Sequence, residues 1–501
     1  MAERTWRQGR RGFLRTAAAA TSALPASFLF ARHAVASPFG ALRPDPARIL
    51  DLPEGFSYRV LERSLQPMDD GYRVPGRPDA MGCFPGPEGT LVLMRNHENY
   101  PRQRDLAPWR SGQAPPAEAY DRGGNGGVTR VVVRADTFER VSSNLVLAGT
   151  TANCAGGWSP WGWLSCEESV DDGHGYVFLC RTDAERVQPP HRIPAYGRFY
   201  HEAAVVDPET LVAYLTEDRE DGCFYRFVPD RKDAPFAGRL QALRVVGSGK
   251  ERLETTRRMR PGEVVEVDWV DIDDPDPADD TVRSQAQARG AALFRRAEGM
   301  TGWQGAIYVC ATKGGPVDGG QIFRHVPGEG GRGGTLELVA QSTDRDALDM
   351  PDNIGFAPWG DLFMAENGPG DTFLVALDAR GGTYKFARNA LSGSEFAGVC
   401  FSPDGRALFV NLQDDGLTLV VTGPFPDTTQ HSGNAPSRST LPAENLPPGT
   451  TSAPAPTLSS ESHYFTGCSS HTTPQRVGIA GSAIVGAGVL AWLARRLCSR
   501  S

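Results

Sequence analysis

The sequence predicts an all-β fold, a six-bladed β-propeller with inserted loops and a few short helices, and three observations carry this prediction. Short runs rich in β-branched and aromatic residues alternate with turn clusters from about residue 37 to 425. A helical period is confined to residues 279–299. One pattern, a turn followed by an apolar run and then polar residues, occurs six times. The 57 glycines and 39 prolines among 501 residues supply the turns that such a fold requires.

The six copies of this pattern lie at residues 85–98, 159–169, 207–221, 302–315, 357–368 and 402–416. Two of them are almost the same, "PWGWLSCEES" from Pro160 and "PWGDLFMAENG" from Pro358. Their irregular spacing fits blades that repeat while the loops between them vary in length. A closed propeller brings the ends of its innermost strands to one axis, whereas a β-sandwich, the competing architecture, would bury the same strands without gathering their ends.

We place the body of the protein at residues 37–425. The segments on either side of it indicate export and tethering. Residues 1–36 contain Arg10-Arg11, an alanine-rich apolar stretch and a small-residue cleavage site, and they resemble a twin-arginine signal peptide. Residues 426–476 are rich in Pro, Ser and Thr and predict a disordered stalk. Residues 477–501 combine an apolar stretch just long enough to cross a bilayer with a basic tail, and predict a transmembrane or sorting segment. We expect the twin-arginine machinery to export the protein to the periplasm or cell surface, where it stays membrane-tethered unless this segment is processed.

Composition and missing motifs exclude several classes of function. The formal charge is −8 and no lysine/arginine run is interleaved with aromatics, so nucleic acid is not an expected partner. No CxxC or HExxH spacing, GxSxG elbow or P-loop occurs, which removes most support for serine-hydrolase and nucleotide-driven chemistry. Seven of the nine cysteines lie in the body and cannot all pair, so at least one is free, buried or bound to a metal. We expect a monomer.

Acids gather at the predicted strand ends, and they make a metal site the natural hypothesis. Carboxylates that line one axis repel each other at a cost of many kcal/mol unless cations are present. Hard oxygen ligands favour calcium or ferric iron, and a cysteine thiolate favours a transition metal. Each residue taken singly has a plainer explanation, since an acid at a strand end is most often solvated and a cysteine most often a buried thiol. The candidate metal ligands are Glu98, Glu168, Glu202, Asp218, Glu298, Asp352 and Glu366, with Cys154 and Cys166 as the candidate thiolates.

Six blocks between about Leu52 and Pro424 resemble the PhoX family of bacterial alkaline phosphatases. They are "RNHE", "NCAGGWSPWGWLSCEES", "GRFYHEAAVVDPETLVAYLTEDREDGCFYRFVP", "RRAEG", "DMPDNIGFAPWGDLFMAENG" and "EFAGVCFSPDGRALFVNLQ". The resemblance implies a six-bladed propeller, twin-arginine export and a phosphomonoesterase whose cofactor combines Fe3+ with Ca2+. It also implies a mostly carboxylate ligand set with one cysteine thiolate on iron.

The resemblance assigns roles to individual residues. By motif, Glu202, Asp218 and Glu298 correspond to metal ligands, and Arg296 corresponds to a phosphate contact. The sequence Arg296-Ala297-Glu298 stands where the family more commonly has Arg-Pro-Glu, and both functional side chains are kept. Lys313 in "ATKGG" is the candidate for a phosphate-contacting lysine. The iron-binding cysteine is either Cys154 or Cys166; the glycine turn that follows Cys154 favours it narrowly.

These features together predict an exported, metal-dependent phosphatase that hydrolyses small phosphomonoesters at an iron/calcium cluster in the propeller centre. Two alternatives remain at this stage. One is a calcium-dependent lactonase-type propeller hydrolase, which needs a single cation and no thiolate. The other is a non-enzymatic surface-binding propeller in which calcium only braces loops. Metal content separates them, because iron together with calcium is expected of the phosphatase alone.

Overall fold

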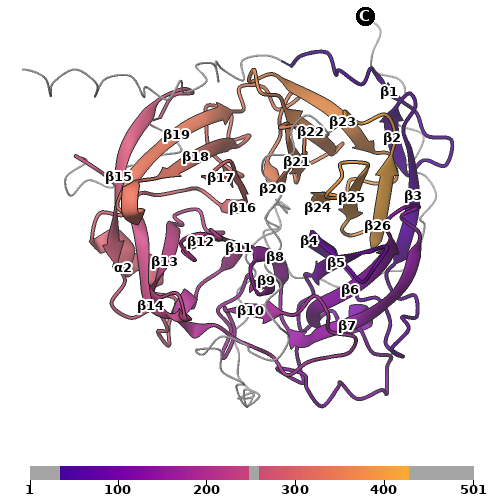
Figure 1. Cartoon of the computed structure of the whole chain (residues 1–501), viewed down its shortest axis with the longest axis horizontal. Helices are drawn as coiled ribbons and strands as arrows, with labels where there is room; N and C mark the ends of the chain where they lie inside the picture. Colours follow the sequence, from indigo (N-terminus) through magenta and orange to yellow (C-terminus); the bar gives the residue numbers. More distant parts are fainter. Residues whose placement is uncertain (1–33, 248–258, 428–501) are drawn as a thin grey trace, which may run out of the picture. The chain divides into compact units, whose positions relative to one another are not determined.

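The computed structural model describes residues 34–247 and 259–427, and within these ranges the fold is a β-propeller (Figure 1). The expected transmembrane or sorting segment at 477–501 lies outside the described residues, as do residues 1–33 of the expected signal peptide and nearly all of the expected stalk. No helix among the described residues is long and apolar enough to span a membrane.

Six blades are arranged in a ring, and each runs antiparallel from an innermost to an outermost strand. The first blade contains β4 (Pro78–Pro85), β5 (Thr90–His97), β6 (Gly126–Arg134) and β7 (Arg140–Thr150). The second contains β8 (Asn153–Ser159), β9 (Gly162–Glu167) and β10 (Val177–Cys180). The third contains β11 (His201–Val206), β12 (Ala213–Glu217), β13 (Phe224–Arg231) and β14 (Ala234–Val245).

The remaining three blades repeat this order. The fourth contains β16 (Ala297–Trp303), β17 (Ala306–Ala311), β18 (Gln321–Pro327) and β19 (Gly334–Gln341). The fifth contains β20 (Pro351–Phe356), β21 (Leu362–Glu366), β22 (Phe373–Leu377) and β23 (Thr383–Asn389), and β2 (Leu50–Pro53) and β1 (Leu42–Arg43) extend it outward. The sixth contains β24 (Phe396–Phe401), β25 (Ala407–Leu412), β26 (Leu417–Thr422) and, from the start of the chain, β3 (Ser57–Arg63).

The ring closes through strand pairing between distant parts of the chain. The innermost strands β4, β8, β11, β16, β20 and β24 each contact the next, and β24 contacts β4. β3 pairs with β26, so the sixth blade joins residues near the beginning of the body to residues at its end. A buried ion pair supports this closure, because Arg95 Nη2 lies 2.7 Å from Glu62 Oε2 on β3. The predicted all-β propeller is therefore confirmed.

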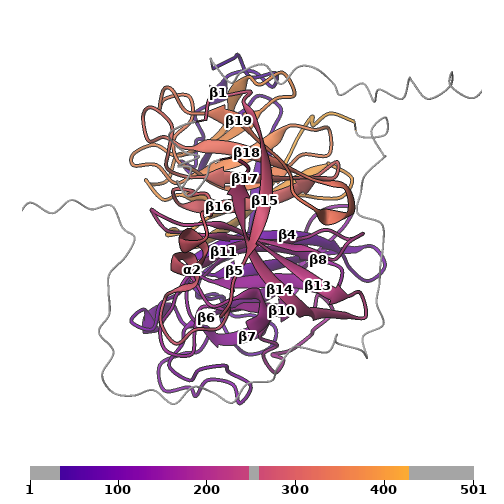
Figure 2. The ribbon, with the colours of Figure 1, turned by 90° about the vertical axis from the view of Figure 1, so that its left-hand side faces the viewer.

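One further strand joins the third and fourth blades. β15 (Val264–Asp271) pairs with β14 on one side and β19 on the other, so these two blades form one nine-stranded sheet (Figure 2). Helical structure in the described residues is limited to α2 (Val282–Ala288), within the region where a helix was predicted, and three single turns, η1 (Arg104–Leu106), η2 (Pro194–Tyr196) and η3 (Glu329–Gly331).

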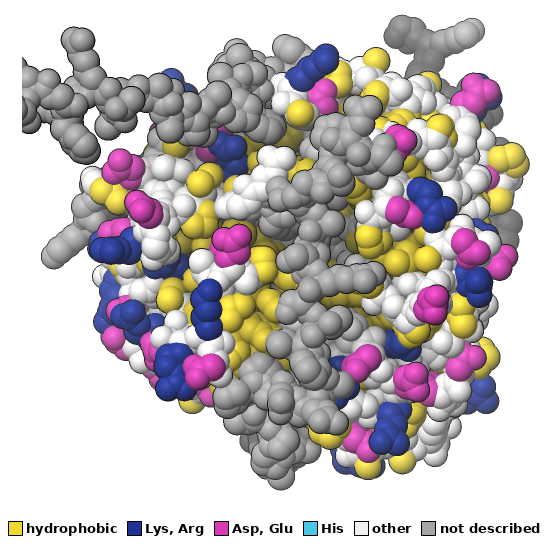
Figure 3. Space-filling view, viewed as in Figure 1, with side chains coloured by type: hydrophobic (Ala, Val, Ile, Leu, Met, Phe, Trp, Pro, Cys, Tyr) yellow, Lys and Arg dark blue, Asp and Glu magenta, His cyan; other side chains and the backbone are white. Residues whose placement is uncertain are grey.

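The core lies within and between the blades, where apolar side chains from neighbouring sheets pack together. Large side chains such as Phe178, Phe224 and Phe363 are fully buried there. On the face shown in Figure 3, acidic and basic side chains of the described residues are mixed around the rim, with no basic patch that would favour nucleic acid.

Candidate active site

Every innermost strand begins with a β-bulge, and the bulges place chemically active side chains at the same end of the ring. Strand pairing breaks directly after the first residue of β4, β8, β11, β16 and β20, and after the second residue of β24. A bulge leaves its extra residues unpaired and re-aims their side chains. The second residue of the first five strands is an acid or a cysteine, and we call these five the axial ring: Asp79, Cys154, Glu202, Glu298 and Asp352.

A second set of polar side chains surrounds the axial ring. In all six blades, the residue that follows the second strand donates its backbone N–H to the carbonyl of the residue directly before the innermost strand. The distances are 2.8 to 3.2 Å. This repeated hydrogen bond holds the two segments side by side. The residues in this outer position are Glu98, Glu168, Asp218, Thr312, Asn367 and Gln413.

The backbone before the innermost strands is bent into a left-handed conformation in four blades. Arg77, Ala152, Arg296 and Met350 have φ of 43°, 46°, 53° and 52°. Non-glycine residues rarely adopt this conformation, and it persists only where the surrounding structure enforces it, often at functional sites. Here it turns the chain into the bulge that presents the axial side chain.

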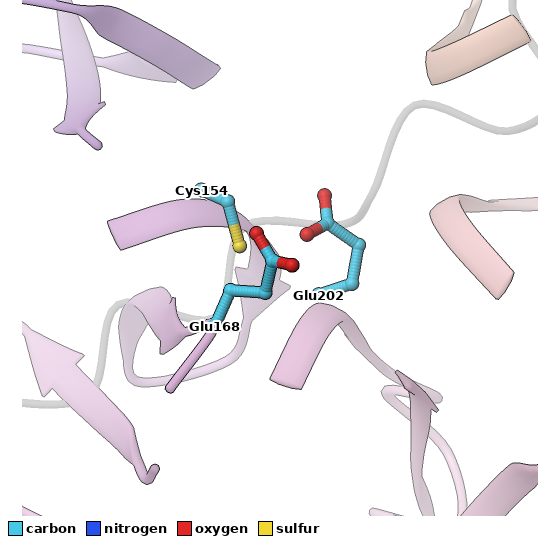
Figure 4. Close-up of side chains that lie close together, drawn as sticks. All are labelled: Cys154, Glu168 and Glu202. Atoms are coloured by element: carbon cyan, nitrogen blue, oxygen red, sulfur yellow. The ribbon is translucent and has the colours of Figure 1, made fainter. Parts of the chain in front are cut away.

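Three side chains meet closely enough to share one metal ion. A ligand atom from each of Cys154, Glu168 and Glu202 lies within 4.8 Å of the other two. The side chains point toward one another from the second and third blades (Figure 4). Cys154 and Glu202 are buried, and the Cys154 thiol also donates to the carbonyl of His201 at 3.3 Å. Of the two candidate cysteines, the geometry places Cys154 at this site.

Burial raises the pKa of every member of the axial ring above its ordinary value. Burial, and then the charge of Asp352, raise the pKa of Glu202 well above its ordinary value. Burial likewise raises the pKa of Glu298 well above its ordinary value against the opposing effect of Arg296. Burial, followed by the charges of Glu202 and Glu168, raises the pKa of the Cys154 thiol. A multivalent cation would reverse these shifts, because it stabilises the ionised form of every ligand.

Arg296 connects two of the predicted ligands. Its Nε and Nη2 donate to the two oxygens of Asp218 at 2.9 and 3.1 Å, and Nη2 also forms an ion pair with Glu298. Both carboxylate oxygens of Glu298 are buried and have no hydrogen-bond partner beyond this ion pair. Lys313 lies beside this segment, and its ammonium pairs with the exposed acid Glu220, which Arg295 also contacts.

Three other predicted ligands have different surroundings. Cys166 is buried in an apolar cluster with Leu164 and Val177. Glu366 accepts the backbone N–H groups of Asp349 and Phe373 at 2.7 and 3.1 Å, so it fixes a loop. Glu98 lies in the outer set, where it receives hydrogen bonds from three side chains described below. The structure does not bring these three residues into the group formed by Cys154, Glu168 and Glu202.

Two acids of the site were not predicted from the sequence. Asp79 belongs to the axial ring, and burial together with the charge of Glu98 raises its pKa well above the ordinary value. Glu395 precedes β24 directly, and burial and the charge of Asp352 raise its pKa as well. A signal for Asp79 was present, because Arg77-Pro78-Asp79 repeats the pattern of Arg296-Ala297-Glu298.

The donor set fits a metal centre. The five side chains of the axial ring are buried or half-buried and come from five different blades. Cys154, Glu168 and Glu202 have the spacing of metal ligands. The two oxygens of Glu298 are buried and have no hydrogen-bond partner beyond the ion pair with Arg296. A thiolate among carboxylates suits a transition metal, and the remaining oxygens suit a hard cation. The fold and this site define a metal-binding class of β-propeller.

The family of the protein follows from sequence comparison. The alkaline phosphatase PhoX family matches residues 37–146 and 136–416, which together cover most of the chain. The chain belongs to this family, and it is a metal-dependent phosphomonoesterase. No curated protein matches it significantly.

Two solved structures are similar to this one, and the first of them supports the fold. The structure is similar to that of Pseudomonas fluorescens PhoX in complex with vanadate, a transition-state analogue, with a TM-score of 0.58 and 19% identity over 75% of this chain and 96% of that chain. It also matches the periplasmic gluconolactonase PpgL of Pseudomonas aeruginosa, with a TM-score of 0.36 and 14% identity over 75% of this chain and 93% of that one.

Proposed function

We propose that this protein is an exported phosphatase that hydrolyses small phosphomonoesters at an iron–calcium cluster on the propeller axis. The observation that carries the proposal is the convergence of Cys154, Glu168 and Glu202, whose ligand atoms lie within 4.8 Å of one another. Cys154 and the two glutamates would hold iron, because a thiolate with carboxylates suits that metal. Glu298, Asp352 and Asp218 would supply oxygen ligands for calcium.

The proposed reaction depends on positive charges that are already in place in the site when the substrate binds. When bound, the cations supply Lewis-acid charge that neutralises the phosphoryl oxygens. Arg296 binds those oxygens and stabilises the charge that grows on them in the transition state. Asp218 fixes the plane of the Arg296 guanidinium through its two hydrogen bonds, and Glu298 holds it from the neighbouring segment. Lys313, which Glu220 holds nearby, adds positive charge that favours an anionic substrate.

The sequence patterns of the terminal segments support the proposal of export. Residues 1–36 have the features of a twin-arginine signal, and that route moves folded proteins, so the cluster would be assembled before export. The C-terminal segment at 477–501 would tether the propeller to the membrane unless it is processed. The protein acts as a monomer, since the described blades of one chain supply every ligand of the proposed cluster.

The deciding experiment is metal analysis of the natively purified protein together with two assays. We expect iron and calcium in the same sample, a visible absorption band from sulfur bound to ferric iron, and hydrolysis of p-nitrophenyl phosphate without hydrolysis of a γ-lactone. Calcium alone combined with lactone hydrolysis would favour the lactonase alternative. A folded, active sample without iron or calcium would refute the proposal.

A further inference from the structure

Arg77 occupies the same backbone position in the first blade as Arg296 does in the fourth. Each precedes an innermost strand and has a positive φ, 43° for Arg77 and 53° for Arg296. The carbonyl of each receives the N–H of the residue after the second strand, from Glu98 at 3.0 Å and from Thr312 at 2.8 Å. Since these blades lie three places apart in a ring of six, the two arginines enter the site from opposite sides.

The guanidinium of Arg77 is bound to acids in its own and the adjoining blade. Nη2 lies 2.6 Å from Glu98 Oε2, and Nε donates to the carbonyl of Glu98 at 3.1 Å. Nη1 forms an ion pair with Asp414, which follows the second strand of the sixth blade. The positive charge of Arg77 also acts on Glu395. Three acids from two blades therefore share one fixed cation.

Donors from the protein occupy both oxygens of Glu98. Tyr100 donates its hydroxyl to Oε1 at 2.7 Å, and Gln413 donates Nε2 to Oε2 at 2.9 Å. The same Gln413 amide donates to Asp79 Oδ2 at 2.6 Å. On this side of the ring, the carboxylates of Glu98 and Asp79 thus accept hydrogen bonds from N–H and O–H groups of the protein. On the other side, the two buried oxygens of Glu298 have no hydrogen-bond partner beyond the ion pair with Arg296.

We propose that the Arg77 guanidinium is a built-in counter-ion that takes the place of a metal cation beside Glu98 and confines the cluster to ligands of the second to fifth blades. This inference rests on the proposed metal-dependent function. Arg77, Tyr100 and Gln413 together contact both carboxylate oxygens of Glu98, so a metal ion cannot bind this carboxylate without displacing one of them. The arginine also keeps its charge at every working pH. Glu98 then acts as a positioning residue for Arg77 and Asp79. The metal ligands come from the second to fifth blades.

The test is a count of metal ions per chain in the full-length holoenzyme, measured by elemental mass spectrometry across a calcium titration. We expect Arg77→Gln to bind one more calcium ion per chain than the wild type, because the carboxylate left beside it needs a cation. Arg77→Lys keeps the charge, so its count should equal that of the wild type. The double variant Arg77→Gln with Glu98→Gln should return to the wild-type count, since the acid that recruits calcium is gone.

Arg140→Gln is the matched control. Arg140 also bridges two acids, Glu62 and Asp69, but it lies on the outermost strand of the first blade. Its removal should leave the metal count unchanged, which separates the effect of Arg77 from a general response to an unpaired acid.

A second variant tests the inference even if Arg77→Gln does not fold. Glu98→Gln alone should keep the wild-type number of metal ions, and loss of one ion would overturn the inference. Equal counts in the wild type and a folded Arg77→Gln variant would overturn it as well. A wild type without any metal would instead contradict the proposed function on which the inference rests.

Discussion

Arg296 and Asp218 form a two-point ion pair across the boundary between the third and fourth blades, with Nε and Nη2 at 2.9 and 3.1 Å from the two carboxylate oxygens. Both side chains are largely shielded from water, with 11% and 4% of their surface exposed. Such a pair fixes the guanidinium plane, which a single contact does not. The orientation of the only arginine that touches Glu298 among the described residues is therefore set by a neighbouring blade.

Arg296→Lys should reduce kcat/KM for p-nitrophenyl phosphate by about 100-fold, because an ammonium cannot reproduce the planar fork at the developing phosphoryl charge. Steady-state kinetics measures this effect. Arg295→Lys is the matched control, because Arg295 is the neighbouring residue and pairs with the exposed acids Glu220 and Asp318. That variant should change kcat/KM by less than about twofold. An equal loss in both variants would contradict a role for Arg296 in phosphate binding.

Glu298→Gln should lose metal and activity together, because this residue offers two buried oxygens to a cation and receives no hydrogen bond beyond the Arg296 ion pair. Elemental analysis of iron and calcium measures the loss. Full metal content and activity in this variant would rule out Glu298 as a ligand.

Glu366→Gln should behave differently, although Glu366 also ends a strand with a buried carboxylate. Its oxygens accept the backbone N–H groups of Asp349 and Phe373, so the substitution disturbs a loop. We expect the metal content to be unchanged and the free energy of unfolding to fall by about 1–3 kcal/mol. Loss of metal from this variant would show that Glu366 is a ligand after all.

The architecture was predictable because its signals are local. All six patterns found in the sequence correspond to the second strand of a blade, where a turn precedes a mostly apolar run that is fully buried, as in β21 and β25. The innermost strands were harder to recognise. β8 reads Asn153 to Ser159 with two glycines, and its bulge breaks the alternation expected of a strand. Sequence patterns therefore located the blades but not the strands that carry the axial ring.

The site was predictable only in part, because proximity around an axis depends on ring closure. Glu202, Asp218 and Glu298 share motifs with a known family, and in the structure the charge of Asp218 acts on both glutamates. Glu395 stands in unremarkable surroundings in the sequence, and Asp79 is marked only by the resemblance of Arg77-Pro78-Asp79 to Arg296-Ala297-Glu298. The closing contact between β24 and β4 brings both to the other acids. Glu366 and Cys166 carry the right chemistry in the right repeat, but their strand positions direct them to a loop and to the core.

Cys154→Ser should abolish the visible absorption band and reduce the iron content, because Cys154 is the thiol within 4.8 Å of the ligand atoms of Glu168 and Glu202. Cys166→Ser should keep the band. Cys166 is fully buried among apolar side chains, so its substitution should instead lower the free energy of unfolding by about 1–2 kcal/mol. Electronic absorption spectra of the two purified variants decide between them. A band that survives in Cys154→Ser and disappears in Cys166→Ser would reverse the assignment.

From the buried contacts of His174 we predict that the stability of the fold depends on pH. Its Nδ1 lies 2.7 Å from Glu167 and its Nε2 lies 3.5 Å from Asp121. Burial lowers the pKa of His174, but the charge of Glu167 and the contacts with both acids outweigh it and raise the pKa from 6.5 to about 10. The folded state therefore holds a proton that the unfolded chain releases, so the imidazolium stabilises the fold fully below about pH 6.5 and loses this effect as the pH rises through about 10.

His174→Gln should accordingly be less stable than the wild type by about 3–5 kcal/mol at pH 6, with a difference that shrinks steadily between pH 6.5 and 10. Chemical unfolding at a series of pH values measures the difference. His191→Gln is the control, because burial lowers the pKa of His191, so this histidine is neutral in both the folded and the unfolded state above about pH 8. Its difference from the wild type should stay constant from about pH 8 to 10, where that of His174→Gln still shrinks. A difference for His174→Gln that is also constant from pH 6.5 to 10 would show that this histidine is neutral in the folded protein.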